Sequence, residues 1–171
     1  PGSSQLFTAS ASTTPVQLAR WSYDPVSHDL VEEEGMSTSS GAPRDLDVSP
    51  DGLRVALTTS TGNSGSRTVW NMDAASLSSQ LGEWPAGPSY LRGAAFSPDG
   101  EHILIGNEDG LNLLGVSTHA TVESWSTSYS DCDGDSTNSI SVSPGGSVMY
   151  SLQSCDVGAR ISWVVWDPQG P

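Results

Sequence analysis

The segment richest in metal-ligating oxygens is the run of alternating aspartates Asp131, Asp133 and Asp135. Carboxylates spaced two residues apart in a turn are hard oxygen ligands, and calcium-binding loops use this arrangement. The full EF-hand pattern is not met, because Ser136 stands in place of the invariant Gly and Val142 in place of the bidentate Glu. Two interpretations remain: a calcium site at Asp131, Asp133 and Asp135, or a solvated acidic loop.

Other residue types that carry chemistry are scattered along the chain. The histidines His28, His102 and His119 are expected in separate turns, too far apart to share a metal ion. The sequence shows no nucleophile elbow, no paired catalytic carboxylates in a motif and no phosphate-cradling Gly loop. The sequence therefore predicts no catalytic residue and no organic cofactor.

An internal repeat sets the positions of these residues. The tetrapeptide Ser-Pro-Asp-Gly begins at Ser49 and again at Ser97, and the variant Ser-Pro-Gly-Gly begins at Ser143, so the offsets are 48 and 46 residues. This period is typical of β-propeller blades, which take about 40–50 residues each. The Pro presets φ and the Gly tolerates positive φ, as a tight hairpin between two strands requires.

Apolar residues continue the repeat beyond the turn. Val55 and Leu57 follow the first turn at the same distances at which Ile103 and Ile105 follow the second. A further strand that ends in an acidic or polar turn recurs in phase with each hairpin, at 67–73, 113–117 and 163–167. The pattern predicts antiparallel sheets of an inner strand a, strands b and c, and an outer strand d.

The sequence Ala-Phe-Ser-Pro-Asp-Gly at 95–100, continued by 106–110 and 115–118, resembles a WD40-type repeat. The Gly-His pair that often opens a WD40 blade is missing, and Trp-Asp occurs only at Trp166-Asp167. The resemblance therefore extends to related propeller families with the same hairpin. It implies an all-β propeller of four-stranded antiparallel blades.

The repeat is truncated at both ends of the chain. Residues 17–24 match strand c with only strand b before it, and strand c at 163–167 has no strand d after it. Fourteen strands are expected, in groups of three, four, four and three. We expect 1–171 to be part of a single propeller domain, with a partial blade 1–41, blades 42–90 and 91–138, and a partial blade 139–171. Propellers close with about 4–8 blades. This partial ring of about 3.5 blades therefore needs completion by the same polypeptide or by a second copy.

The two cysteines, Cys132 and Cys155, are predicted to form a disulfide. Cys132 falls in the connection from strand d to strand a, and Cys155 in the loop between strands b and c of the same blade. These two loops emerge on one face of a four-stranded blade, so the thiols are expected on the same side. A disulfide across a loop of this size would stabilise the fold by roughly 3 kcal/mol. Two free buried thiols are the alternative.

The tryptophans and one acidic run are candidates for contacts with a partner. Four tryptophans at strand-c positions are expected to pack between blades, and two on outer strands are expected to be freer: Trp21, Trp70, Trp163 and Trp166 in the first group, Trp84 and Trp125 in the second. The run at 29–34 is expected on an outer strand, where charges guard an exposed edge. A docking surface for a basic partner is the alternative interpretation.

The charge balance limits the classes of partner. The chain has twenty acidic residues, six arginines and no lysine, which gives a net charge of −14. Such a chain repels nucleic-acid phosphates and anionic lipid headgroups, so no nucleic-acid partner is expected. No stretch approaches the roughly 20 apolar residues of a membrane helix, so no membrane insertion is expected. The cysteine pair favours an extracytoplasmic location: secreted, periplasmic or on the cell surface.

Two functions from different classes are compatible with this pattern. The first is a binding scaffold whose loops on one face engage a protein or glycan partner. The second is a propeller enzyme of the lactonase or hydrolase type, with a site over the central channel completed by residues outside this chain. The repeat favours the first, although fold alone does not decide function.

Overall fold

The computed structural model describes residues 4–10, 16–38, 41–60, 67–85, 91–107, 110–126, 137–143, 147–155 and 158–165. Within these ranges the regular structure is β-strand, in fourteen strands and four antiparallel sheets. Strands that follow one another in the chain are neighbours in their sheet, so every pairing is a simple up-and-down one.

Sheet 1 consists of β1 (Ser4–Ser10), β2 (Val16–Tyr23) and β3 (Leu30–Thr38), and sheet 2 of β4 (Ala42–Val48), β5 (Arg54–Ser60), β6 (Arg67–Asp73) and β7 (Ser76–Pro85). Sheet 3 consists of β8 (Leu91–Phe96), β9 (His102–Asn107), β10 (Gly110–Gly115) and β11 (Ala120–Ser126), and sheet 4 of β12 (Thr137–Val142), β13 (Ser147–Cys155) and β14 (Gly158–Val165).

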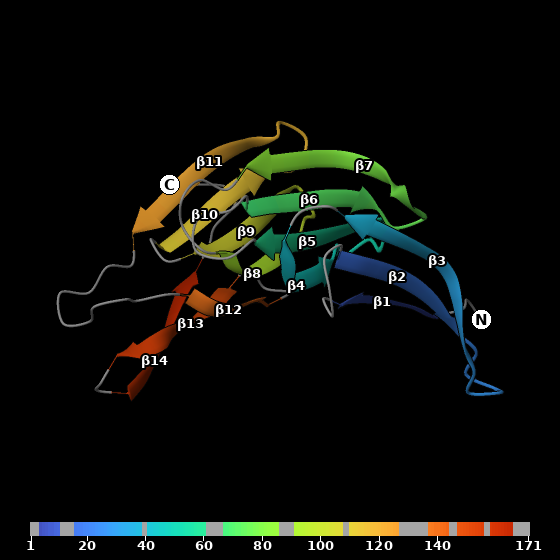
Figure 1. Ribbon diagram of the computed structural model, residues 1–171. Helices are drawn as coiled ribbons and strands as arrows, with labels where there is room; N and C mark the ends of the chain where they lie inside the picture. Colours follow the sequence, from blue (N-terminus) through green and yellow to red (C-terminus); the bar gives the residue numbers. More distant parts are fainter. Residues whose placement is uncertain are drawn as a thin grey trace.

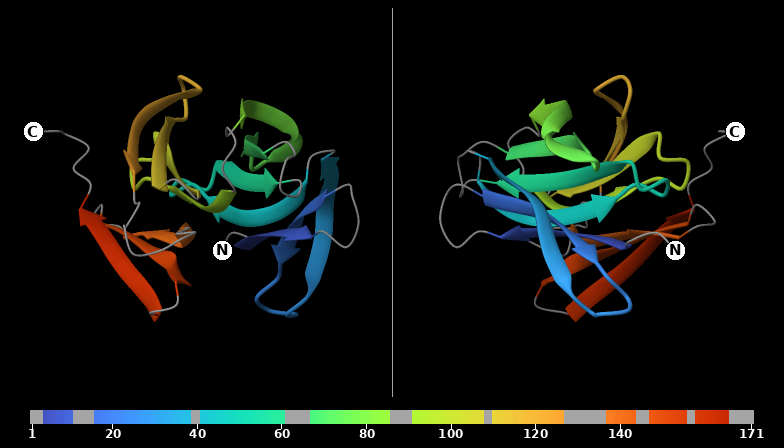
Figure 2. Two further views of the ribbon diagram at one scale, coloured as in Figure 1. Left: turned by 60° about the vertical axis from the view of Figure 1, so that its left-hand side comes forward. Right: turned by 90° about the vertical axis from the view of Figure 1, so that its right-hand side faces the viewer.

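The four sheets follow one another in an open arc, with sheet 1 and sheet 4 at its two ends (Figures 1 and 2). The first strand of each sheet contacts the first strand of the next, so β1 touches β4, β4 touches β8, and β8 touches β12. We call β4, β8 and β12 the inner strands. At the opposite edges of their sheets, the last strands β3 and β7 also contact each other.

Burial along the strands reflects this stacking. Strand β5 lies between sheets 1 and 3, and six of its seven residues are buried. A strand covered on both faces reads as a continuous run of buried residues rather than as an alternation. Strand β1 alternates between exposed and half-buried residues, because only one face of sheet 1 packs on sheet 2. The alternation of exposed and half-buried residues along β1 is therefore what a sheet at the end of the arc should show.

Three apolar clusters fill the junctions between consecutive sheets. Between sheets 1 and 2, Leu18 packs with Val55, Leu57 and Met72. Between sheets 2 and 3 the cluster includes Val69, Trp84, Leu91, Phe96, Ile103 and Ile105. Between sheets 3 and 4 it includes Leu104, Leu111, Leu113 and Ile140. Each junction is therefore a small face-to-face sandwich of two sheets.

The all-β class and the antiparallel pairing predicted from the sequence are confirmed, and the strands fall into the expected groups of three, four, four and three. The repeated apolar positions Val55, Leu57, Ile103 and Ile105 are all at most 2% exposed. The described residues include no helix with the length and apolar character needed to cross a membrane.

Candidate functional site

The Ser-Pro-Asp-Gly turns have the same hydrogen bonds in both described copies. Ser49 Oγ donates to Asp51 Oδ1 at 2.6 Å and accepts from Arg54 N at 2.9 Å. Leu53 N donates to the same Asp51 oxygen at 3.0 Å, and Gly52 adopts φ 72°, a conformation that favours glycine. The hydrogen bond from the Ser49 side chain, with that from Leu53 N, lowers the pKa of Asp51.

In the second copy, Ser97 Oγ donates to Asp99 Oδ1, accepts from His102 N at 3.0 Å, and is followed by Gly100 at φ 73°. The serine and aspartate of the motif therefore hold the hairpin closed. Because the polar atoms of this serine and aspartate bond within the turn, a structural role is sufficient to explain why the motif is repeated.

A pair of half-buried carboxylates lies just before the first of these turns, on β4. Asp45 Oδ2 accepts from Ala94 N at 2.9 Å, and Asp47 Oδ2 accepts from Phe96 N at 2.7 Å. Both donors belong to β8, an edge strand whose outward N–H groups have no strand partner. Burial raises the pKa of both carboxyls, and the hydrogen bonds from β8 offset part of that rise.

A cavity of about 270 Å³ opens where the three inner strands end. Its lining comes from three consecutive repeats: Val48, Phe96 and Val142 occupy equivalent positions, as do Pro50 and Pro98, and Asp47 and Ser143 complete it. Asp47 is the sole ionisable side chain among these seven residues. We call this cavity the inner-strand pocket.

Two features make the inner-strand pocket the best candidate site. Its walls are largely proline, valine and phenylalanine, and apolar walls with a few placed polar groups are typical of binding pockets. Its one carboxylate is held in place by Phe96 N and half-removed from water, which strengthens its interaction with a cation.

A second cavity, of about 330 Å³, lies on the face of sheet 1 that points away from sheet 2. Trp21, Thr8, Gln17 and Glu32 are among its lining residues. Trp21 Nε1 donates to Thr8 Oγ1 at 2.9 Å. In sheet 2, Trp70 Nε1 donates to Thr59 Oγ1 at 3.2 Å in the same register. This open face of sheet 1 is thus the structural equivalent of the sheet 2 face that sheet 1 covers.

Most of the residues predicted to bind calcium or to form the disulfide lie outside the described ranges. Asp131, Asp133, Asp135 and Cys132 lie outside the described residues, and Cys155 is described only as the backbone at the end of β13, opposite Gly158. In the described ranges no group of three or more His, Cys, Asp or Glu side chains could hold a metal ion. The calcium site and the disulfide stay predictions.

The three histidines occupy separate positions, as expected. His28 lies in the turn between β2 and β3 and contacts Tyr23, and His102 begins β9. His119 adopts φ 53° in the turn between β10 and β11, where its ring packs edge-on against Trp84 with ring centroids 5.3 Å apart. A Cβ on Gly82 would lie 2.6 Å from His119 Nε2, so any other residue there would require this ring to shift.

The expectation that Trp84 is freer to contact a partner was wrong, whereas for Trp125, which is partly exposed, it stays a prediction. Trp84 is 5% exposed and packs in the junction between sheets 2 and 3. Trp125 packs partly buried against the cluster between sheets 3 and 4. Both lie on outer strands, but sheets stacked face to face bury the outer strands too. Trp70 packs between sheets as expected, whereas Trp21 lines the open face of sheet 1. The side chains of Trp163 and Trp166 lie outside the described residues.

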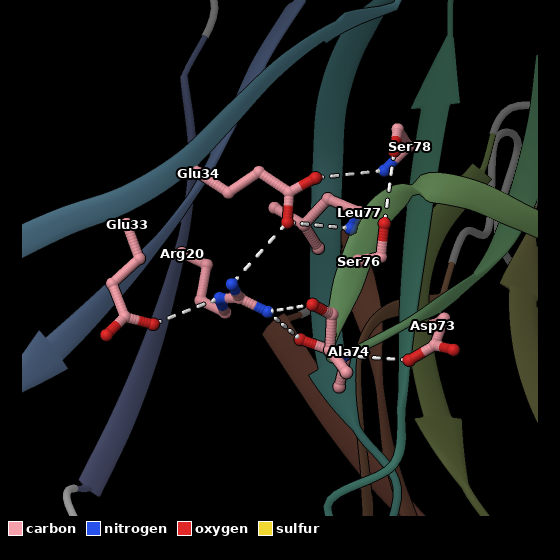
Figure 3. Close-up of polar contacts among 9 residues, drawn as sticks. Arg20, Glu33, Glu34, Asp73, Ala74, Ser76, Leu77 and Ser78 are labelled. Atoms are coloured by element: carbon pink, nitrogen blue, oxygen red, sulfur yellow. Dashed lines mark hydrogen bonds and ion pairs between the residues drawn. The ribbon is translucent and has the colours of Figure 1, made fainter.

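The acidic run at 29–34 forms part of the outer strand β3, as predicted, but part of it is a contact between sheets. Figure 3 shows Arg20 between the carboxylates of Glu33 and Glu34, at 3.4 and 3.6 Å, and the turn that leads into β7. Arg20 Nη1 donates to Ala74 O at 2.9 Å, and Glu34 Oε2 accepts from Leu77 N at 3.1 Å. Glu34 therefore ties sheet 1 to sheet 2.

Comparisons with known proteins add no family. The chain matches no protein-family model, and a search of curated proteins gives no significant match. The resemblance to WD40-type repeats therefore stays a prediction that rests on the repeated motif.

Asp45 and Asp47 were missed in the sequence, although a signal for them is present. Asp45-Leu46-Asp47-Val48 alternates charged and apolar residues immediately before a repeat turn. On an inner strand this alternation places two carboxylates on one buried face, where they need hydrogen-bond donors. Carboxylates directly before the Ser-Pro-Asp-Gly turn could therefore have been predicted to bind the neighbouring strand.

Proposed function

We propose that this chain is a β-propeller binding module that engages a protein partner at the inner-strand pocket. The observation that carries the proposal is the convergence of three consecutive repeats on one cavity with apolar walls and a single carboxylate. Repeat proteins build their binding surfaces in this way, from equivalent positions of neighbouring units.

The propeller arrangement is supported by the order of the sheets. The repeat period matches that of propeller blades, the strands of each sheet pair up and down in chain order, and the inner strands β4, β8 and β12 contact in succession. In such an arrangement the inner strands line a central channel, and their ends form its mouth. The inner-strand pocket would then lie at that mouth.

Completion of the ring is part of the proposal. Leu57 and Trp70 on sheet 2 are covered by Phe7, Ala9, Leu18 and Met36 of sheet 1. The equivalent residues of sheet 1, Leu6 and Trp21, line its open face, and Leu6 is 46% exposed. A further sheet, from the same polypeptide or from a second copy, would cover this face as sheet 1 covers sheet 2. Light scattering should then find self-association of residues 1–171, and a folded monomer would contradict completion by a second copy.

The binding proposal is tested by selecting ligands without assuming their chemistry. A random peptide library displayed on phage is panned against residues 1–171, and selected peptides are mapped by amide hydrogen exchange. We expect slowed exchange at the ends of β4, β8 and β12. Peptides that map only elsewhere, or a selection that yields no specific binder while a glycan array does, would contradict the proposed protein-binding site.

A further inference from the structure

The inner-strand pocket has two chemically different parts. Pro50 and Pro98 provide aliphatic wall. Val48, Phe96 and Val142 also line the cavity, although their side chains pack in the junctions between sheets. Asp47 provides the polar part, and its Oδ2 is fixed by Phe96 N at 2.7 Å. A ligand that matches both parts needs an apolar stem that ends in a positive charge. The side chains of Arg and Lys have this form.

The size of the cavity favours a single side chain over a larger ligand. At about 270 Å³ it lies just below the range of roughly 300–1,000 Å³ typical of pockets for small-molecule ligands. A sugar ring would need several hydrogen-bonding groups around it, whereas most of the wall here is Pro, Val and Phe. The pocket therefore suits one long, amphipathic side chain.

The charged residues of the two turns beside the pocket are mostly acidic, with Arg54, which donates to Gly100 O, as the cation between them. Asp51 and Asp99 lie in the turns that follow Pro50 and Pro98, and their carboxylates are engaged by Ser49 and Ser97. The chain as a whole carries a net charge of −14. A field of this sign raises the local concentration of basic ligands and speeds their association.

Resting on the proposed function, we propose that the inner-strand pocket binds the side chain of an arginine on a protein partner, with the guanidinium paired to Asp47 and its stem against Pro50 and Pro98. Arginine fits better than lysine, because its planar group pairs with a carboxylate through two N–H donors. Asp47 keeps acceptor capacity for it, since each carboxylate oxygen has more than one lone pair.

The test uses a small probe, so that it does not depend on knowing the partner. N-acetyl-arginine methylamide is titrated into isotope-labelled protein, and the amide signals of Val48, Phe96 and Val142 are followed by NMR. N-acetyl-citrulline methylamide is the matched neutral probe. We expect saturable shifts of these three signals with the arginine probe, and binding weaker by about tenfold or more with citrulline.

Variants separate the pocket from the overall charge. Asp47→Asn keeps an acceptor for Phe96 N and removes the charge, so it should weaken binding of the arginine probe about tenfold. Asp29→Asn removes one charge from the turn between β2 and β3 and should leave binding within about twofold. Pro98→Ala keeps Asp47 but removes part of the apolar wall, and should also weaken binding. Circular dichroism checks that each variant is folded.

The outcomes distinguish this inference from the proposed function. Equal shifts with arginine and citrulline, or full binding by folded Asp47→Asn, would overturn the arginine pocket. Selected peptides that protect the pocket but contain no basic residue would overturn it too, while leaving the binding module intact. Peptides that protect other surfaces alone would overturn the proposed function itself.

Discussion

The two junctions on either side of sheet 3 join their inner strands in different ways. Between β4 and β8, the carboxylates of Asp45 and Asp47 accept hydrogen bonds from the backbone of β8. Between β8 and β12, the equivalent positions are Gly93 and Ala95. There the strands approach directly, since a Cβ on Gly93 would lie 3.1 Å from Ile140 N.

This difference shows that equivalent positions of one repeat can join neighbouring strands in two ways. Backbone N–H groups at a strand edge need partners, and carboxylates provide them at the first junction. The consequence is an ionisable group beside a cavity, because Asp47 both caps Phe96 N and lines the inner-strand pocket. The second junction contributes Val142 and Ser143 to the lining, and no charge.

The largest expected difference between the two junctions concerns their tryptophans. Trp84→Ala removes a side chain that is 5% exposed between sheets 2 and 3, and should lower the free energy of unfolding by roughly 3–5 kcal/mol. Trp125→Ala, at the partly buried position between sheets 3 and 4, should lower it by about 1–2 kcal/mol. Urea denaturation gives both values, and equal losses would contradict the difference in burial. Trp84→Phe, which keeps an aromatic ring, is the control and should lose less than Trp84→Ala.

A second expected effect concerns the hydrogen bond from Phe96 N to the Asp47 carboxylate, which we call the carboxylate cap. Asp47→Ala leaves Phe96 N, in a residue 3% exposed, without its acceptor, and should cost roughly 1–3 kcal/mol of stability. Asp47→Asn keeps an acceptor and should cost less. The melting temperature of both variants, measured by calorimetry, checks this order. Equal melting temperatures for the two variants would show that the loss of charge, rather than the loss of the hydrogen bond, determines the change in stability.

Arg54 is expected to contribute a weaker link across the junction between sheets 2 and 3. Its Nη1 donates to Gly100 O at 3.2 Å and so links the turn of sheet 2 to the turn of sheet 3. We expect Arg54→Ala to cost about 0.5–1.5 kcal/mol, and Arg54→Lys, which keeps a donor, to cost less. Chemical denaturation measures the loss. An Arg54→Lys variant as unstable as Arg54→Ala would show that the donor plays no part.

The smallest expected effect is a pH dependence of opposite sign in strand and turn carboxylates. The raised pKa values of Asp45 and Asp47 mean that the folded chain holds their protons more tightly, so the free energy of unfolding falls as pH rises above the ordinary value of 3.8. The lowered pKa of Asp51 means that its contribution is present above pH 3.8 and is lost as pH falls below it.

Thermal unfolding of the wild type, Asp47→Asn and Asp51→Asn between about pH 3 and 7 tests this sign. Asp47→Asn should flatten the decline above pH 3.8, and Asp51→Asn should reduce the loss below it. Identical profiles for the two variants would contradict the assigned environments.

The sequence predicted what local residue chemistry determines. The Ser-Pro-Asp-Gly turns and the apolar positions after them follow from proline, glycine and alternation, so the strands and their pairing could be derived. Trp84 could not be placed, because its burial depends on how sheet 3 packs on β7 and on the space over Gly82 that His119 fills. Arg20 and Glu34 were missed for a related reason: their partners at Ala74 and Leu77 lie more than forty residues away.

The carboxylate cap also makes the repeats of this chain unequal as evolutionary and engineering modules. A duplicated unit 42–90 would carry Asp45 and Asp47 with it and could cap the first strand of whichever unit follows. A duplicated unit 91–138 would bring Gly93 and Ala95, and would demand close backbone approach from its successor. The two units therefore place different requirements on the unit that follows them, and exchanging their order would change which neighbouring strands fit together.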